Sequence, residues 1–291
     1  MSATAASRGG RPQSRDTVQS IGRAVDLLRL IATRGARGAR ISDLVAWSGL
    51  PAPTAHRILK SLQAEGLVTH TAAHEYRIGP LAYELGLAAA SRPHPADICA
   101  PVLEDLAQRT GHPTHLLIPS GLEMVCIQRA VPSSYQVRPS ASEAMRRRGN
   151  QASTLRWVGG VGVRRPIGVA AGGQVILSEM PDAEMEQVLK ANADAYRRYF
   201  TGPDEVRVAV QRTRHMGYAV TASGTPRFFH LGVAVHDGEG KAVAALKILR
   251  LASETRTGGT DRLLALLNRA ALEIQRLSPL LPWTSILSFR G

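Results

Sequence analysis

The sequence predicts an α+β protein in two parts: a winged helix-turn-helix, then a linker helix leading to a domain built on an antiparallel sheet. The first observation is the order of patterns over residues 17–79, where three amphipathic helices precede a two-stranded hairpin. The second is a change near residue 113 to short β-rich runs that alternate with helices and turns. A chain of 291 residues has room for two domains and a substantial core.

The N-terminal part is expected to begin with an amphipathic helix over 17–33. Two short helices broken by a tight turn follow within 41–65, which reads ISDLVAWSGLPAPTAHRILKSLQAE. Ser42 is expected to cap the first of them. Gly49 gives the turn its backbone freedom, and Pro51 stops the first helix from continuing.

The second short helix, 53–65, has Ile58, Leu59 and Leu62 on one face and polar side chains elsewhere. Two helices joined in this way form a helix-turn-helix, whose second helix enters the DNA major groove. Arginine and lysine at its exposed positions suit phosphates and guanine edges. An ordinary helical hairpin inside a core is the alternative, but the flanking segments also fit a DNA-binding module.

A two-stranded wing is expected after this recognition helix. Gly66 can close the helix as the residue just beyond its cap, and 67–70 and 76–79 read as paired strands. Such a wing lies along the phosphate backbone, where contacts position a protein without reading sequence. The residues expected to contact DNA are Ser42, Ala52, Pro53, Thr54, His56, Arg57, Lys60 and Ser61 on the helices, with His74 and Arg77 on the wing.

Three stretches within residues 17–90 resemble the IclR family of bacterial transcriptional regulators. They are VQSIGRAVDLL, ISDLVAWSGLPAPTAHRILKSLQAEGLV and YRIGPLAYELG, against the family patterns VQSxxRAxxLL, GLPxSTxxRLLxTLxxxGxV and YxLGxxxxxLG. Many spaced identities make this resemblance more specific than a lone helix-turn-helix. One departure is Ala52-Pro53, where the family usually has a small or basic pair before the threonine, so a different operator is expected.

The resemblance implies a sequence-specific DNA-binding transcriptional regulator, a repressor or an activator, that is controlled by a small-molecule effector and is not an enzyme. It also implies a homodimer or homotetramer that binds a palindromic operator in double-stranded DNA. The alternative is a GAF-like ligand-binding or enzymatic domain whose helix-turn-helix serves only dimerisation. Specific, salt-dependent binding to a short duplex separates the two.

Composition bounds the remaining possibilities. The formal net charge is +13 and the pI is about 10.7, which favours a polyanionic partner. Residues 1–16, rich in Gly, Ser, Ala and Arg, are predicted to be a disordered basic arm. Cys99 and Cys126 have no paired spacing and are expected to be reduced thiols of a cytoplasmic protein. Neither a signal peptide nor a run of 18 apolar residues occurs, so a soluble protein without a membrane partner is expected.

The linker helix is predicted over 80–93, where the proline-rich breaker Arg92-Pro93-His94-Pro95 ends it. An effector-binding and dimerisation domain is expected over 94–279, and a C-terminal tail over 280–291. Residues 140–160 are polar, basic and glycine-rich, and predict an inserted loop. The expected helices of the domain are 96–110, 170–178, 182–193, 206–216 and 263–277; the expected strands are 114–119, 124–130, 135–139, 217–220, 231–235 and 242–249.

This second part resembles the GAF-like effector domain of the same family, on weaker motifs. Residues 162–177 match the family pattern GxRxPLHxTAxGKALLA, 217–219 match GYA, and 231–237 match IAAPVFD. The resemblance places a small-molecule site between the GxRxP loop, the helix after it and the late strands. The expected site residues are Arg164, Arg165, Ile167, Gly168, Val169, Ala170, Val220, Ser223, Phe229 and His230.

Several polar anchors of the family's site are replaced in this chain. Gly168 and Ala170 stand where His and Thr are frequent, and His230 stands where Cys precedes IAAPV. An apolar or aromatic effector is therefore expected rather than a short keto acid, because few fixed donors remain for a strongly hydrated anion. A filled core without any effector is the alternative. An inward-turned Arg164 or Arg165 would instead favour a carboxylate.

Signatures of enzymes and metal sites are weak in this sequence. It contains no GxxxxGK[ST] loop and no GxSxG elbow, and its histidines are scattered rather than grouped. No metal and no cofactor is expected.

Overall fold

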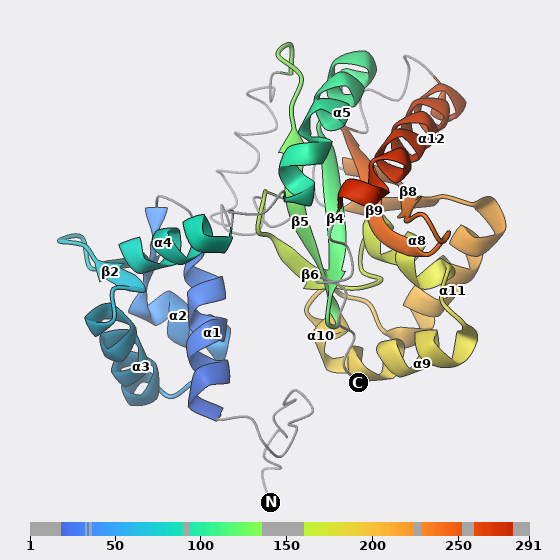
Figure 1. The fold of residues 1–291 in the computed structure, drawn as a ribbon. Coiled ribbons are helices and arrows are strands. Elements are labelled where there is room, and N and C mark those ends of the chain that lie inside the picture. The colour runs from blue at the N-terminus through green and yellow to red at the C-terminus, as the bar shows by residue number, and fades with distance from the viewer. Residues whose placement is uncertain are drawn as a thin grey trace, which may run out of the picture. The chain divides into compact units, whose positions relative to one another are not determined.

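The computed structural model describes residues 19–32, 34, 37–89, 94–135, 160–223, 228–251 and 259–281 (Figure 1). The chain divides into two compact units, 1–92 and 93–291. The expected basic arm, the strand expected over 135–139 apart from its first residue, the insertion apart from its last residue, and the tail beyond Leu281 lie outside the described residues.

The first unit has the expected winged helix-turn-helix order, followed by the expected linker helix (Figure 1). Its three-stranded sheet has the order β1-β3-β2, with both pairings antiparallel. Apolar side chains from the first three helices and the wing form one core, in which Leu27, Ile31, Leu44 and Leu59 are fully buried. The elements are α1 Gln19–Ala32, β1 Ala39–Arg40, α2 Ile41–Ser48, α3 Ala52–Ala64, β2 Val68–His70, β3 Glu75–Ile78 and α4 Pro80–Ala89.

The start of α2 corrects the expected cap. Arg40, not Ser42, precedes the first helical residue, and no side chain caps this end. The reason is the short strand β1, whose last residue Arg40 is extended and pairs with Glu75 of β3, so that the helix begins directly at Ile41. Ser42 is exposed in the first helical turn. A two-residue strand has too short a pattern for the sequence to indicate it.

Two glycines end the helices of the motif as expected. Gly49 has φ of 67° and its N–H donates to the Val45 carbonyl, which closes α2. Gly66 has φ of 71°, and its N–H donates to the Gln63 carbonyl at 3.1 Å. The next amide, of Leu67, donates to Leu62 at 2.9 Å, which completes a Schellman motif at the end of α3.

The second unit is a six-stranded antiparallel sheet of order β6-β5-β4-β9-β8-β7 with helices on both faces (Figure 1). One face packs against α5 and α12, and the other against α8 and α11. The elements are α5 Pro95–Thr110, β4 Thr114–Ser120, β5 Glu123–Ala130, β6 Arg164–Pro166, α8 Ala171–Ser178, α9 Asp182–Ala191, α10 Ala193–Arg197, α11 Pro203–Met216, β7 Ala219–Ser223, β8 Phe228–His236, β9 Ala242–Leu251, α12 Thr260–Arg276 and the 3-10 helix η3 Ser278–Leu280.

The predicted helices and strands within the described part of this unit are present, with several ends shifted. The elements α11, β8 and α12 each begin three residues earlier than expected, at Pro203, Phe228 and Thr260. The strand expected from Gly217 begins at Ala219, because Gly217 has φ of 74° and closes α11. The helix expected over 182–193 is broken at Asn192, after which the short α10 begins. Strand β6 was expected only as part of a loop. Cys99 and Cys126 are buried and not disulfide-bonded, as expected.

Candidate DNA-binding surface and candidate effector pocket

The exposed face of α3 carries the predicted DNA-contacting side chains. Ala55, Leu59 and Leu62 are buried in the core of the first unit, which fixes the rotation of the helix. That rotation leaves Ala52, Pro53, His56, Arg57, Lys60 and Ser61 exposed and Thr54 half-buried. The structure therefore brings seven of the predicted residues together on one helix surface. Pro53 lies in the first turn, where proline is compatible with a helix.

The basic side chains of the wing differ in their exposure, whereas the sequence suggested that all of them face the phosphate backbone. His74 is exposed at the tip, with φ of 58°. Arg77 is half-buried and forms an ion pair with Glu75 at 3.1 Å, so part of its charge is already balanced. His70, a third basic residue expected on the wing, is exposed on β2 with its ring centroid 4.6 Å from that of Tyr76.

A cavity lies in the second unit between β6, the first turn of α8 and the sheet strands β4, β5 and β9. Its volume is about 20 Å³, room for one water-sized group, and about 400 Å³ when its open mouth is counted. Two of the predicted effector residues, Arg165 and Ala170, line it. The full lining is Leu117, Met124, Cys126, Val163, Arg165, Pro166, Ala170, Gly172, Gly173 and Lys247.

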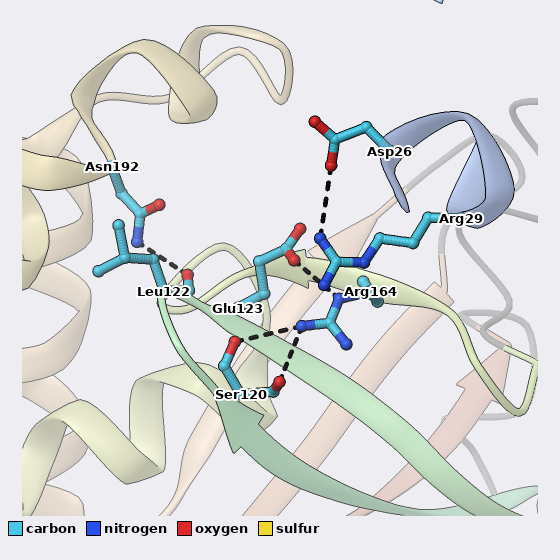
Figure 2. Close-up of polar contacts among 7 residues, drawn as sticks. All are labelled: Asp26, Arg29, Ser120, Leu122, Glu123, Arg164 and Asn192. Carbon is cyan, nitrogen blue, oxygen red and sulfur yellow. Dashed lines mark hydrogen bonds and ion pairs between the residues drawn. The ribbon is translucent and has the colours of Figure 1, made fainter. Parts of the chain in front are cut away.

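The other arginine of the GxRxP motif lies elsewhere. Arg164 forms an ion pair with Glu123, with 2.7 Å between Nε and Oε2 (Figure 2). Its Nη2 also donates to the Ser120 hydroxyl at 2.9 Å and to the Ser120 carbonyl at 3.2 Å. These bonds join the β4–β5 turn region to β6, and Arg164 does not line the cavity. The expectation that Arg164 and Arg165 share one site is not met, because neighbouring residues of a strand point to opposite faces.

The remaining predicted effector residues do not line the cavity. Ile167 and Gly168 are buried, and Val169 is partly buried. Val220 is 44% exposed. Phe229 is half-buried on β8, and Ser223 ends β7. His230 is fully buried on β8.

Lys247 is the residue that the sequence reading missed. It lies in β9 within the run AVAALKILRL and is 3% exposed. Its Cα is paired with His115 on β4 and with Gly232 on β8, so these three positions face the same side of the sheet. His230, two residues before Gly232, faces that side too. A single lysine inside an otherwise apolar strand was the available signal.

Burial and neighbouring positive charge set the protonation of this region. The pKa of Lys247 is lowered from 10.5 to about 7, first by burial and then by the charge of Arg165. The pKa of His230 is lowered well below its usual value by burial and by the charges of Lys247, Arg165 and His115, which keeps its ring neutral. Burial raises the pKa of the Cys126 thiol. No aspartate or glutamate is among the described residues that line the cavity.

Glycines let α8 approach the sheet closely at the cavity. A Cβ atom on Gly173 would lie 2.3 Å from the Gly168 backbone nitrogen, closer than any relaxed contact allows. A Cβ on Gly232 would lie 3.2 Å from the Cβ of Ala171. The backbone amide of Ala171 donates to the Thr221 hydroxyl at 3.3 Å, a further link that sequence reasoning did not identify. The first turn of α8 is therefore held against β7 and β8.

Neither a metal cluster nor a membrane span is found in the described part of the chain. No group of three or more potential ligand side chains occurs there. No helix there is long and apolar enough to cross a membrane.

Two family models match this chain. The IclR helix-turn-helix domain matches residues 20–72, and the bacterial transcriptional regulator IclR C-terminal domain matches residues 145–276. Together they cover more than half of the chain, and they correspond to the two units of the fold. The chain belongs to the IclR family of transcriptional regulators.

Individual relatives agree with this assignment. The chain is 30% identical to a glycerol operon regulatory protein of Streptomyces griseus, over 84% of this chain and 87% of the relative. Its fold is similar to an IclR transcriptional regulator from Alicyclobacillus acidocaldarius, with a TM-score of 0.65 and 23% identity over 90% of this chain and 99% of that one. It is also similar to an IclR homologue complexed with 4-hydroxybenzoate from Microbacterium hydrocarbonoxydans, with a TM-score of 0.59 and 19% identity over 89% and 98%.

Proposed function

We propose that this regulator reads its operator with the exposed face of α3 and holds the flanking phosphates with its wing. The single observation that carries this is the orientation of α3, which buries Ala55, Leu59 and Leu62 and leaves His56, Arg57 and Lys60 outward. Arginine pairs with guanine through two hydrogen bonds, and lysine suits phosphates or guanine. Ser42, Ala52, Pro53, Thr54 and Ser61 complete the surface on the helices, and His74 and Arg77 complete it on the wing.

The operator is expected to be a palindrome bound by a homodimer or by a dimer of dimers. A two-fold protein imposes its symmetry on DNA, so half-site centres lie about one helical turn, or a multiple of it, apart. Ala52 and Pro53 offer no hydrogen-bond donor from their side chains at the start of α3. Base contacts there are therefore limited to apolar contacts such as those with thymine methyl groups.

The test is selection of duplexes by the purified full-length protein, followed by footprinting and light scattering of the complex. A symmetrical footprint bound by an even number of protomers supports the proposal. The salt dependence of the affinity reports how many phosphates are contacted, because each one releases counterions. A monomer that protects one unsymmetrical half-site would refute it.

Control by a small molecule is assigned to the cavity beside α8. The expected apolar or aromatic body of the effector suits its walls, which include Leu117, Met124 and Pro166. The 4-hydroxybenzoate complex of the similar Microbacterium protein supports an aromatic ligand for this fold. Of the ten residues predicted from the sequence, Arg165 and Ala170 line this cavity. Thermal-shift screening of aromatic acids, amides and short keto acids against the full-length protein tests which chemical class of ligand binds.

The proposal includes no catalytic step, metal or cofactor, and the protein is expected to act as a repressor or an activator. The DNA-binding domain is assigned to 17–79, the linker helix to 80–93 and the effector-binding and dimerisation domain to 94–279. Residues 1–16 and 280–291 are assigned as flanking segments. A bacterial regulator meets its operator in the cytoplasm, which is therefore the proposed location.

A further inference from the structure

Lys247 is a charged residue type in an environment that disfavours charge. It is 3% exposed in the middle of β9. Moving an ammonium group from water into a low-dielectric interior is unfavourable unless an opposite charge accompanies it. In the described part of the chain, no carboxylate forms an ion pair with Lys247 or contributes to its pKa. Its side chain reaches a cavity rather than solid packing.

The groups that face Lys247 from the surrounding strands are all basic or neutral. They are His115 on β4, Cys126 and Arg129 on β5, Arg165 on β6 and His230 on β8. Arg165 is only 8% exposed and lines the same cavity. The electrostatic potential in the cavity is therefore positive, and an anion there would interact favourably with every charged neighbour.

The first turn of α8 adds to this potential. Ala170, Gly172 and Gly173 line the cavity at the positive end of this eight-residue helix. The amides of Ala171 and Gly173 donate to Thr221 and Ala170 respectively. The amide of Gly172 has no acceptor among the described residues. A helix start that combines such an amide with a buried cation favours the binding of an anion.

Given the proposed ligand control of this domain, we propose that the cavity is a carboxylate site in which Lys247 binds the acid group of the effector. Lys247 takes up one proton from solvent as the anion enters, and the ammonium and the carboxylate then neutralise each other. Arg165 and the α8 amides complete the recognition of the carboxylate. The apolar body of the effector extends toward the mouth of the cavity, so the ligand class is an organic acid with an apolar or aromatic body.

Proton uptake is expected because the Lys247 amine is largely neutral before the ligand binds and protonated afterwards. With a pKa of about 7 in the unliganded protein, Lys247 is largely neutral above neutral pH. A bound carboxylate raises this pKa, because an opposite charge nearby favours the ammonium. Binding is then strongest below pH 7 and weakens as pH rises, by about tenfold per unit while the bound form stays protonated.

Isothermal titration of benzoate into the full-length protein tests the site, with benzamide as the uncharged isostere. Titrations at pH 8 in two buffers of different ionisation enthalpy count the protons taken up. We expect about one proton per benzoate, a dissociation constant that rises about tenfold from pH 7.5 to 8.5, and no comparable binding of benzamide. Equal binding of the two compounds, or binding without proton uptake, would overturn the carboxylate site.

Variants of Lys247 test whether this residue is responsible for benzoate binding and for the proton uptake. Lys247→Met removes the amine while keeping an apolar chain of similar length, and should abolish both benzoate binding and proton uptake. Lys247→Arg restores a charge that does not titrate, so binding should return without proton uptake. Lys241→Met is the matched control, because Lys241 is exposed in the β8–β9 turn. Wild-type binding by Lys247→Met, or no binding of benzoate, 4-hydroxybenzoate or acetate by the wild-type protein at pH 6.5, would refute the assignment.

A gel shift with the selected operator, with and without benzoate, separates this inference from the proposed control of DNA binding. If benzoate binds with proton uptake and the operator affinity is unchanged, the carboxylate site stands and the regulatory proposal fails for this ligand. If the operator affinity responds to benzamide as strongly as to benzoate, ligand control stands and the carboxylate site fails.

Discussion

The hydroxyl of Tyr196 donates a hydrogen bond to the backbone carbonyl of Ile167, with 2.7 Å between the oxygens. Both residues are fully buried, and Tyr196 comes from α10 whereas Ile167 precedes α8. The bond therefore fixes the loop that leads from Arg165 of β6 into the first turn of α8. A second bond acts nearby, from the Asn192 side-chain amide to the Leu122 carbonyl at 3.0 Å (Figure 2). One wall of the cavity is thus held by the short helix that the sequence did not predict.

Tyr196→Phe should destabilise the effector domain by about 1–3 kcal/mol, because the Ile167 carbonyl would be left buried without its donor. The ring and its packing are kept, so the change isolates the hydrogen bond. Urea denaturation followed by circular dichroism measures the difference. Tyr83→Phe, at an exposed tyrosine of α4, is the control. A free energy of unfolding equal to wild type would mean that water replaces the hydroxyl.

Gly173→Ala should cost about 3 kcal/mol or more, because the new methyl would lie 2.3 Å from the Gly168 nitrogen, and backbone atoms yield little. Gly238→Ala is the control in the same domain, since no atom lies within 4 Å of a Cβ there. Thermal unfolding of the two variants gives the comparison. A melting temperature of Gly173→Ala that matches the control would contradict the close approach of α8 to the preceding loop.

The stability of the effector domain should rise with pH above neutrality in wild type. Lys247 has a folded-state pKa of about 7 and an ordinary value of 10.5, so between these values the unfolded chain binds more protons than the folded one. The slope should approach about 1.4 kcal/mol per pH unit relative to Lys247→Met, whose stability lacks this dependence. Urea titrations at pH 7, 8 and 9 measure it. Parallel profiles for the two proteins would show that Lys247 titrates normally.

The two adjacent arginines of the GxRxP motif should differ in their effect on ligand binding. Arg165→Ala should weaken benzoate binding at least about tenfold, because its guanidinium lines the cavity. Arg164→Ala should leave it within about twofold, because Arg164 is held by Glu123 and Ser120. Calorimetry at pH 6.5 measures both. The reverse ranking would mean that the ligand lies outside the cavity.

Arg57→Ala should weaken specific operator binding by about 1–3 kcal/mol, the usual loss for an arginine that contacts a base. Arg57 is exposed on α3, and the packing of that helix is carried by Ala55, Leu59 and Leu62, so the fold should persist. Gel-shift titration with operator and non-specific duplexes gives both affinities. Gln63→Ala, exposed in the last turn of the same helix, serves as the control. An equal loss on both duplexes would reassign Arg57 to the phosphates.

Most helices and strands of both domains could be predicted from local sequence patterns. The arrangement of the pocket could not, because it depends on contacts between residues far apart in the sequence. Gly49 and Gly66 end α2 and α3 through left-handed backbone conformations that the sequence order alone indicates. The cavity joins residues from β4, β5, β6, α8 and β9, and only the strand register reveals that Lys247 lies opposite His115. The family resemblance drew attention to positions that are usually polar. The buried lysine that lines the cavity lies outside the matched motifs, so the resemblance gave no reason to single it out.

The junction between the recognition helix and the linker helix is made of two glycines in direct contact. A Cβ on Gly79 would lie 2.2 Å from the Gly66 carbonyl oxygen. The amide of Gly79 donates to Leu67 at 2.9 Å, and that of Leu81 donates to Gly66 at 3.2 Å. The end of α3 and the start of α4 are thus joined by direct backbone contact and two backbone hydrogen bonds. A displacement of α4 is therefore expected to move the end of α3 with it and not to tilt one helix against the other, because backbone atoms in direct contact leave no room for a hinge.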